Sequence, residues 1–132
     1  MMKRRGKAQS FIEVVTGCLV MVPIALLVVD VVFVLNLSQQ NADLALASAR
    51  MAANQPNDFA ANMTVREALY RFNKPANCRD VSLNQFRYDE VRKVVTVTTA
   101  MEISLPVPLP GCTSTTLTAS SVQPIVGIPA LR

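Results

Sequence analysis

A chain of 132 residues is long enough for one membrane segment and one small domain, and too short for a second hydrophobic core. Four of its 13 basic residues are Lys3, Arg4, Arg5 and Lys7, so nine cations face nine acids in the rest of the chain. The net charge of +4 therefore belongs to the N-terminal tail, whereas a nucleic-acid-binding protein carries its cations on a folded face. The absence of His excludes the commonest acid–base catalyst at neutral pH and any His-containing metal site.

The stretch from Val14 to Leu35 is apolar except for two ionisable side chains, Cys18 and Asp30. At the rise of an α-helix this stretch is about 33 Å long, which matches a hydrocarbon core of about 30 Å. A cleaved secretory signal has a shorter apolar centre followed closely by a small-residue cleavage site, so we expect a retained anchor. The four N-terminal cations precede the stretch and Arg50 is the next one, which predicts a cytoplasmic N-terminus and an external C-terminal part.

The helix is expected to continue outside the membrane, because residues 38–54 are rich in Ala and Gln55-Pro56 follows them as a stop. We expect one helix over residues 10–54, about 65 Å long, in which Pro23 introduces a bend. The predicted division is a basic cytoplasmic N-terminal segment (1–8), a transmembrane helix (9–37), its extension outside the membrane (38–56) and a small external domain (57–132). The extension carries a seven-residue repeat and a stripe of small residues, which would pack on the chain's own domain or on another helix: Leu37, Leu44 and Met51; Ala42, Ala45, Ala49 and Ala52.

The C-terminal part reads as a short helix followed by strands. Asn57-Asp58 can cap a helix, and Thr64 with Glu67 has the form of a capping box before residues 65–72. Strands are expected over residues 81–88, 91–105 and 113–122, with a turn at Asp89-Glu90 and a proline-rich segment, 106–111, that is extended but outside the ladder. The long strand alternates two sets of residues, which predicts a sheet with one covered face: Val95, Val97, Thr99, Met101 and Ile103; Val94, Thr96, Thr98, Ala100 and Glu102. The predicted fold is α+β, a long N-terminal helix and a short helix against a three-stranded antiparallel meander.

Cys78 and Cys112 precede the first and third expected strands, in a compartment that permits oxidation. We expect a disulfide between them, worth about 3–4 kcal/mol; the alternative is two reduced buried thiols. Cys18 lies in the expected membrane segment, where a lone thiol usually serves as a small apolar filler.

Two acids, Glu13 and Asp30, stand in apolar surroundings, where an ionisable group is costly without water or a partner. Three explanations of Glu13 are open. It can lie at the level of the lipid headgroups, it can be stabilised by the helix dipole near the N-terminus of the helix, or it can pair with a cation on a neighbouring chain. Asp30 is about 7–8 Å from the outer end of the apolar stretch. It can reach water there, or pair with a basic group on a partner protein.

The N-terminal part resembles TadE-like proteins, minor pseudopilins of the tight-adherence (Flp-type) pilus systems. The resemblance rests on KRRGKAQSFIEVV at residues 3–15, on Pro23 within the apolar stretch and on Val-Val-Asp ending at Asp30. The family begins with basic residues and Gly-Gln-Ala-x-x-Glu-Phe, followed by a proline in the span and an aspartate near its outer end; Glu13, Pro23 and Asp30 fall on the last three features. It covers residues 3–54 and is loose beyond them, where TLTASSV at 116–122 resembles the family's final strand.

The resemblance implies processing by a prepilin peptidase that leaves the glutamate as the fifth residue. The cut would fall between Ala8 and Gln9, although the family more often has Gly before the cut and here Gly6 lies two residues earlier. Removal of residues 1–8 would leave 124 residues with nine cations and nine anions. The ammonium of Gln9 could then pair with Glu13 of the next subunit. The implied location is a bacterial inner membrane, crossed once with the N-terminus cytoplasmic and residues 38–132 periplasmic, or an extracellular pilus. The implied partners are membrane lipid, the prepilin peptidase, other pilins or pseudopilins and pilus platform proteins.

Two functions follow from these expectations. The first is a minor pilin or pseudopilin that initiates, caps or tunes a tight-adherence pilus. The second is an uncleaved bitopic adaptor of an envelope secretion or pilus machine, which would keep Lys3–Lys7 on its mature N-terminus. An enzyme is not expected, because no Gly-rich phosphate loop, nucleophile with a base, or paired carboxylates are visible. No cofactor, metal, nucleic acid or small-molecule substrate is expected.

Overall fold

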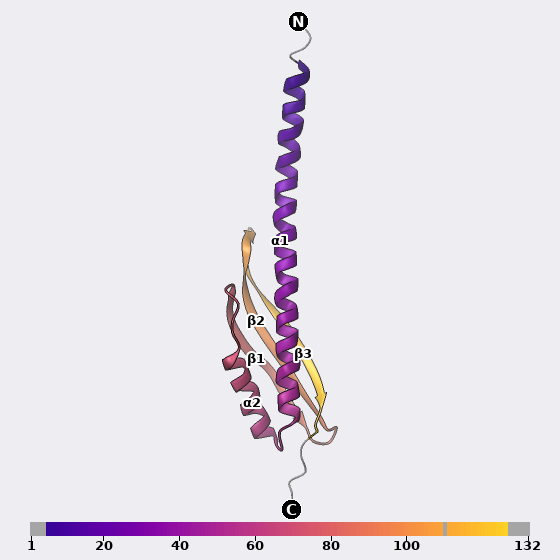
Figure 1. Cartoon of the computed structure of the whole chain (residues 1–132), viewed down its shortest axis with the longest axis vertical. Coiled ribbons are helices and arrows are strands. Elements are labelled where there is room, and N and C mark those ends of the chain that lie inside the picture. The colour runs from indigo at the N-terminus through magenta and orange to yellow at the C-terminus, as the bar shows by residue number, and fades with distance from the viewer. Residues whose placement is uncertain (1–4, 110, 127–132) are drawn as a thin grey trace, which may run out of the picture.

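The computed structural model describes residues 5–109 and 111–126 and has the predicted α+β fold. Two helices, α1 (Arg5–Ala53) and α2 (Asp58–Arg71), precede three strands, β1 (Cys78–Asp89), β2 (Val94–Leu109) and β3 (Cys112–Pro124). The strands lie in the order β1-β2-β3 and both pairs are antiparallel, so the sheet is the expected meander. α1 packs on β2 and β3, and α2 packs on β1 and on α1 (Figure 1).

α1 is one continuous helix of 49 residues that includes Pro23. Figure 1 shows it as a nearly straight rod, with one half alone and the other half alongside the sheet. The expected bend at Pro23 is not pronounced. The helix ends one turn before Pro56, and the backbone N–H of Gln55 closes the last turn on the carbonyl of Ala52 at 3.1 Å.

α2 begins at the first of the two predicted caps. The Asn57 side chain accepts a hydrogen bond from the backbone N–H of Ala60 at 2.8 Å. The expected capping box at Thr64 is wrong, because Thr64 lies inside the helix and its hydroxyl donates to the carbonyl of Ala60 at 2.9 Å. An upstream cap satisfies the first free N–H groups, and the helix therefore starts there. Ala61, Val65 and Leu69 form its buried face.

The covered face of β2 is the one that the alternation predicted. Val95, Val97, Thr99, Met101 and Ile103 have no exposed surface, and the residues between them are partly exposed. The helix face against this sheet consists of Leu37, Asn41, Leu44, Ala45, Ser48, Ala49 and Ala52. These positions follow the helical period of 3.6 residues, so Ala42 and Met51 are exposed and their expected places in the packed stripe are wrong. The stripe packs on the chain's own domain.

A buried polar network ties α1 to two strands. The hydroxyl of Thr99 on β2 donates to the side-chain oxygen of Asn41 at 2.8 Å. The amide nitrogen of Asn41 donates to the carbonyl of Leu117 on β3 at 3.0 Å. Asn41 and Thr99 have no exposed surface, so these bonds are made without competition from water and fix the position of α1 along the sheet.

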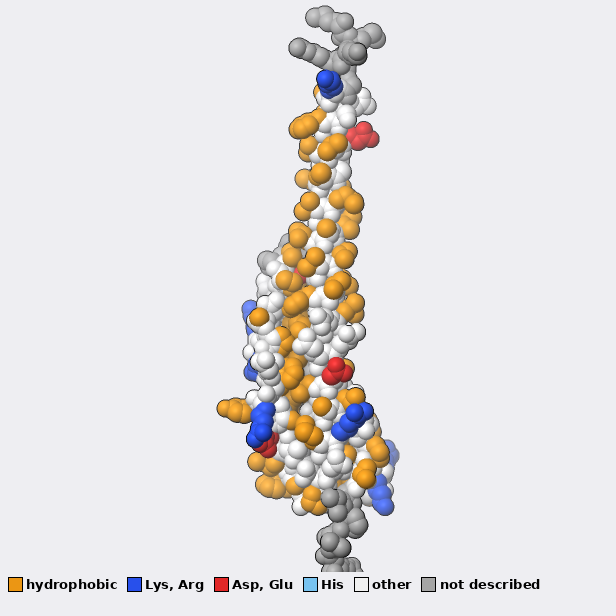
Figure 2. Space-filling view, in the orientation of Figure 1, with side chains coloured by type: hydrophobic (Ala, Val, Ile, Leu, Met, Phe, Trp, Pro, Cys, Tyr) orange, Lys and Arg blue, Asp and Glu red, His pale blue; other side chains and the backbone are white. Residues whose placement is uncertain are grey.

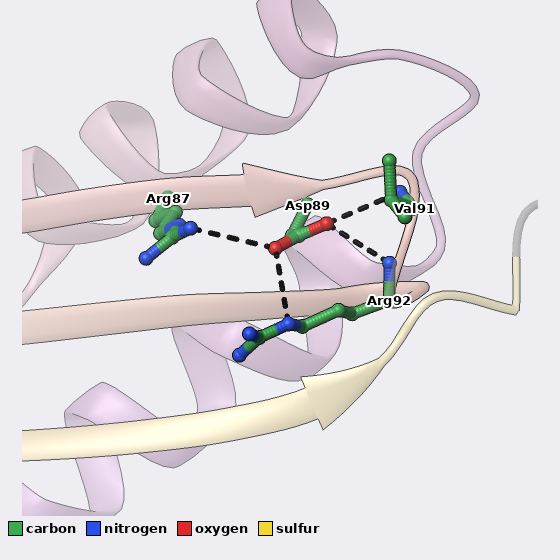
Figure 3. A network of polar contacts seen from close by, with 4 residues as sticks. All are labelled: Arg87, Asp89, Val91 and Arg92. Atoms are coloured by element: carbon green, nitrogen blue, oxygen red, sulfur yellow. Dashed lines mark hydrogen bonds and ion pairs between the residues drawn. The ribbon is translucent and has the colours of Figure 1, made fainter.

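The turn between β1 and β2 is built around Asp89 (Figure 3). Its Oδ1 accepts hydrogen bonds from the backbone N–H groups of Val91 at 3.1 Å and Arg92 at 2.9 Å. Its Oδ2 lies 3.6 Å from a guanidinium nitrogen of Arg87 and 4.0 Å from Nε of Arg92. The backbone N–H of Arg92, with the nearby guanidinium charges, lowers the pKa of Asp89 below its ordinary value. The carboxylate organises a turn that ends with Lys93 at a φ of 52°.

Asp89 is expected to make the stability of the domain depend on pH at the acid end. A carboxyl group whose pKa is lower in the folded state stabilises that state above its unfolded pKa of about 3.9. The contribution is lost as the pH falls through the folded pKa. We expect Asp89→Asn, which keeps one acceptor and loses the charge, to lower the denaturation midpoint at about pH 6 more than at about pH 2. An equal loss at both values would show that the charge contributes nothing.

Candidate functional site

The half of α1 that stands away from the domain is the candidate functional surface. Every residue from Lys7 to Val29 is exposed, and we call this segment the free half of α1. Figure 2 shows its hydrophobic side chains on all visible sides of the rod, while most charged groups lie around the domain. Within the described residues, α1 is the one helix that is long and apolar enough to cross a membrane, and the most apolar part has a mean hydropathy of 2.9 and is only 6% buried. A fully exposed apolar surface of this length requires a partner or a lipid environment.

Glu13 is the one acid on the free half of α1, and its side chain is exposed. Ala8 and Gln9, the residues of the expected cut, are helical and exposed one turn earlier. Lys7 is exposed at the start of the segment and Arg5 opens the helix, while Lys3 and Arg4 lie outside the described residues. Arg5, Lys7, the expected cut after Ala8 and the carboxylate of Glu13 therefore lie within about 12 Å along one helix.

Asp30 lies where the free half of α1 meets the domain. Its side chain is only 5% exposed, so the expected route to water is wrong. Oδ1 accepts a hydrogen bond from the backbone N–H of Val107 on β2 at 3.1 Å. Oδ2 is buried and has no hydrogen-bond partner among the described residues. Sequence reasoning missed this contact because Asp30 and Val107 are 77 residues apart.

The ladder between β2 and β3 explains why Val107 needs an acceptor. Ser104 pairs with Ser114 and Leu109 pairs with Cys112, so four residues of β2 face a single residue of β3 in a bulge. The segment 106–111 was expected to be extended and outside the ladder. Residues 106–108 have no partner in β3, as expected, but the expectation is wrong for Leu109, which pairs with Cys112 at the end of β2. Pro106 and Pro108 have no N–H, and Asp30 takes the N–H of the residue between them.

An apolar groove of about 450 Å³ runs beside Asp30, between α1 and the ends of β2 and β3. Three residues of α1 that line it, Leu27, Val31 and Leu35, are also exposed, at 52%, 48% and 58%. The groove therefore continues the apolar surface of the free half onto the domain. Its lining consists of Leu27, Asp30, Val31, Val34, Leu35, Leu105 and Thr115.

The expected disulfide between Cys78 and Cys112 is not formed, because Cys78 is a free thiol. Cys78 pairs with Ile103, which pairs with Thr115, so β2 separates Cys78 from β3. Two strand spacings are about 9–10 Å, which exceeds the Cα separation of about 7 Å that a disulfide tolerates. The thiol of Cys78 contacts the core beside Leu37, and burial raises its pKa. The alternative, a reduced and partly buried thiol, holds for Cys78.

A second concave surface of about 410 Å³ lies between α2 and β1. It is lined by Arg66, Leu69, Tyr70, Lys74, Asp80, Val81 and Leu83. Lys74 and Asp80 form an exposed ion pair at 3.0 Å, and the hydrogen bond from Lys74 lowers the pKa of Asp80. Exposed pairs of this kind stabilise a protein little, and the surface has no buried reactive group among its lining residues.

The described residues hold no group of three or more Cys, Asp or Glu side chains that could bind a metal ion. The chemistry of the candidate site is therefore that of an apolar rod with an acid near each end, one exposed and one held by the sheet. Comparisons of the chain with models of protein families, with curated proteins and with solved structures gave no match.

Proposed function

We propose that the chain is a minor pilin or pseudopilin of a tight-adherence pilus, processed by a prepilin peptidase and contributing to pilus assembly, initiation or adhesion. In this proposal the free half of α1 lies in the bacterial inner membrane, with the N-terminus cytoplasmic and the domain periplasmic. The observation that carries it is the division of one continuous helix. Residues 7–29 are exposed on all sides and largely apolar, and one face of the helix beyond them packs on the chain's own sheet. The likeness of residues 3–54 to TadE-like proteins supports the same proposal.

Such a helix suits both a bilayer and a helical bundle. In lipid its apolar surface is already satisfied, so association between helices depends on close packing and on polar contacts. Gly17, Cys18 and Ala25 are small residues on this exposed surface, and they allow a second helix to approach closely. The space beside Gly17 is open within the chain, because a Cβ added there would meet no atom within 4 Å. Apolar contacts are non-directional and allow many relative positions of two helices, so a polar contact is needed to fix the register between subunits.

Glu13 is suited to set that register. After removal of residues 1–8, the ammonium of Gln9 lies four residues, or about 6 Å along the axis, from Glu13 of the same chain. A neighbouring helix displaced by about one turn brings its own ammonium level with this carboxylate. Opposite charges attract more strongly in a low-dielectric environment than in water, so the pair favours one displacement over others.

The mature N-terminus tests the proposal. We expect intact mass and N-terminal peptide mapping of the protein from its native host to show loss of residues 1–8, leaving a chain that begins with Gln9. The control is an Ala8→Asp variant, which places a charge at the cut and is expected to keep the leader. A chain that keeps Lys3–Lys7 in the presence of active prepilin peptidase contradicts the proposal and favours the uncleaved adaptor.

A further inference from the structure

The bond between Asp30 and Val107 fixes how far the sheet extends along the helix. It places residues 105–109, the β2 end, beside the turn of α1 that contains Asp30. The exposed side of α1 stays apolar beyond this turn, because Val31, Val32 and Leu35 are 48%, 61% and 58% exposed. Asn36 is the first polar residue after them, so the apolar surface extends about 8 Å past the level of Asp30. If a bilayer covers that surface, the β2 end lies below the boundary of the bilayer.

The β2 end has the composition of a segment that contacts lipid. Residues 105–109 read LPVPL and contain no charged or polar side chain. Pro106 is exposed, and Leu105 and Val107 are half-buried. The charged side chains of the sheet begin further along, where a guanidinium nitrogen of Arg79 lies 3.8 Å from Oε1 of Glu102, while hydroxyl side chains of β3, Thr113 and Thr115, lie beside the β2 end.

The backbone of the β2 end also has few free N–H groups, as contact with lipid requires. Residues 105–108 have no strand partner in β3, and in water such groups would simply be hydrated. In hydrocarbon an unpaired N–H is costly, so irregular backbone must lose its donors or find acceptors within the protein. Of the four residues 105–108, Pro106 and Pro108 have no N–H, and the carboxylate of Asp30 accepts the N–H of Val107, so three of the four present no free donor. An otherwise costly acid in the apolar stretch thus removes a donor that lipid cannot satisfy.

We propose that the β2 end is seated in the outer leaflet of the membrane, with an acyl chain in the groove between Leu27, Leu35 and Leu105. The groove continues the surface of the free half of α1, and the same lipid covers both. The inference rests on the membrane-spanning part of the proposed function and not on cleavage or pilus assembly. It makes the sheet a second membrane contact, which holds the domain at a fixed height and tilt above the bilayer.

The chain contains no Trp, so a single introduced tryptophan reports its own surroundings. Full-length Pro106→Trp protein is reconstituted into phosphatidylcholine–phosphatidylglycerol vesicles, with and without brominated acyl chains. We expect its emission to be blue-shifted, strongly quenched by the brominated lipid and little affected by iodide on both sides of the membrane. A Leu105→Trp variant, which leaves both prolines in place, is expected to give the same result from inside the groove.

Two matched variants separate the possible failures. Val91 lies in the turn at the far end of the sheet and is 94% exposed, so Val91→Trp is expected to be quenched by iodide and not by brominated lipid. Leu19 lies on the free half of α1 and is 74% exposed, so Leu19→Trp is expected to be quenched by brominated lipid. Quenching by lipid at position 19 together with iodide quenching at 105 and 106 overturns this inference alone. No lipid quenching at position 19 overturns the membrane span itself. Shielding of 105 and 106 from both quenchers shows a protein contact there and also overturns the inference.

Discussion

Asn41→Ala is expected to lower the free energy of unfolding of the domain by about 2–4 kcal/mol. The substitution leaves the fully buried hydroxyl of Thr99 and the part-buried carbonyl of Leu117 without their partner. Each buried polar group left unpaired costs about 1–3 kcal/mol. Amide hydrogen exchange of the β2 strand, measured on the full-length chain in detergent micelles, gives this free energy directly.

The partner of Asn41 provides the internal control. We expect Thr99→Val to cost less in the Asn41→Ala background than in the original chain, with a coupling of about 0.5–3 kcal/mol, because the hydroxyl has already lost its acceptor. Asn36→Ala, on the exposed side of the same helix, is expected to change stability by less than about 0.5 kcal/mol. Additive effects of the two buried substitutions would contradict the network.

Ala49→Leu is expected to destabilise the domain by about 1–3 kcal/mol. Ala49 has no exposed surface and belongs to the core cluster that contains Val95 and Val97 of β2. A larger side chain must either push α1 away from the sheet or force these residues out of their preferred rotamers. The hydrogen-exchange measurement applies here too, and the loss of protection is expected in α1 beyond Asp30 as well as in β2.

Ala47→Leu is the matched control, because Ala47 is exposed two residues earlier on the same helix. Leu and Ala have similar helix propensities, so this variant is expected to stay within about 0.5 kcal/mol of the original chain. Equal destabilisation by both variants would show that the small residues of the extension serve something other than packing on the sheet.

The two halves of α1 divide their roles in a way that fits the proposed function. The half beyond Asp30 is fixed to the sheet by small side chains and by the network of Asn41, so the domain cannot turn freely about the helix. The free half carries Glu13 on a rigid extension of the same helix. Under the proposed function, a register set at Glu13 by a neighbouring subunit would therefore be transmitted to the orientation of the domain.

Much of this architecture could be predicted from local patterns. The apolar stretch, the Ala-rich extension and the stop at Gln55-Pro56 predicted one long helix, because helix propensity and proline act over a few residues. The alternation from Val94 to Ile103 identified the covered face of β2, because side chains of a strand alternate between two faces. The expectation that the proline-rich segment lies outside the ladder is confirmed for residues 106–108, since proline has no donor, and is wrong for Leu109, which pairs with Cys112.

The tertiary structure decided what depended on register and on distant contacts. The expected meander already implied that β2 lies between Cys78 and β3, and the expected disulfide was inconsistent with that order; the pairing register shows that the two cysteines are too far apart. The way α1 lies on the sheet selected which face of the helix is packed, and Met51 and Ala42 lie outside that face. Asp30 was recognised as unusual, yet its partner is a backbone group 77 residues away. Local sequence thus determined the helices and strands and their apolar faces. The fold decided which polar groups form hydrogen bonds with each other. Every residue except proline has the same backbone N–H, so the sequence does not show which of these groups a side chain such as Asp30 will bind.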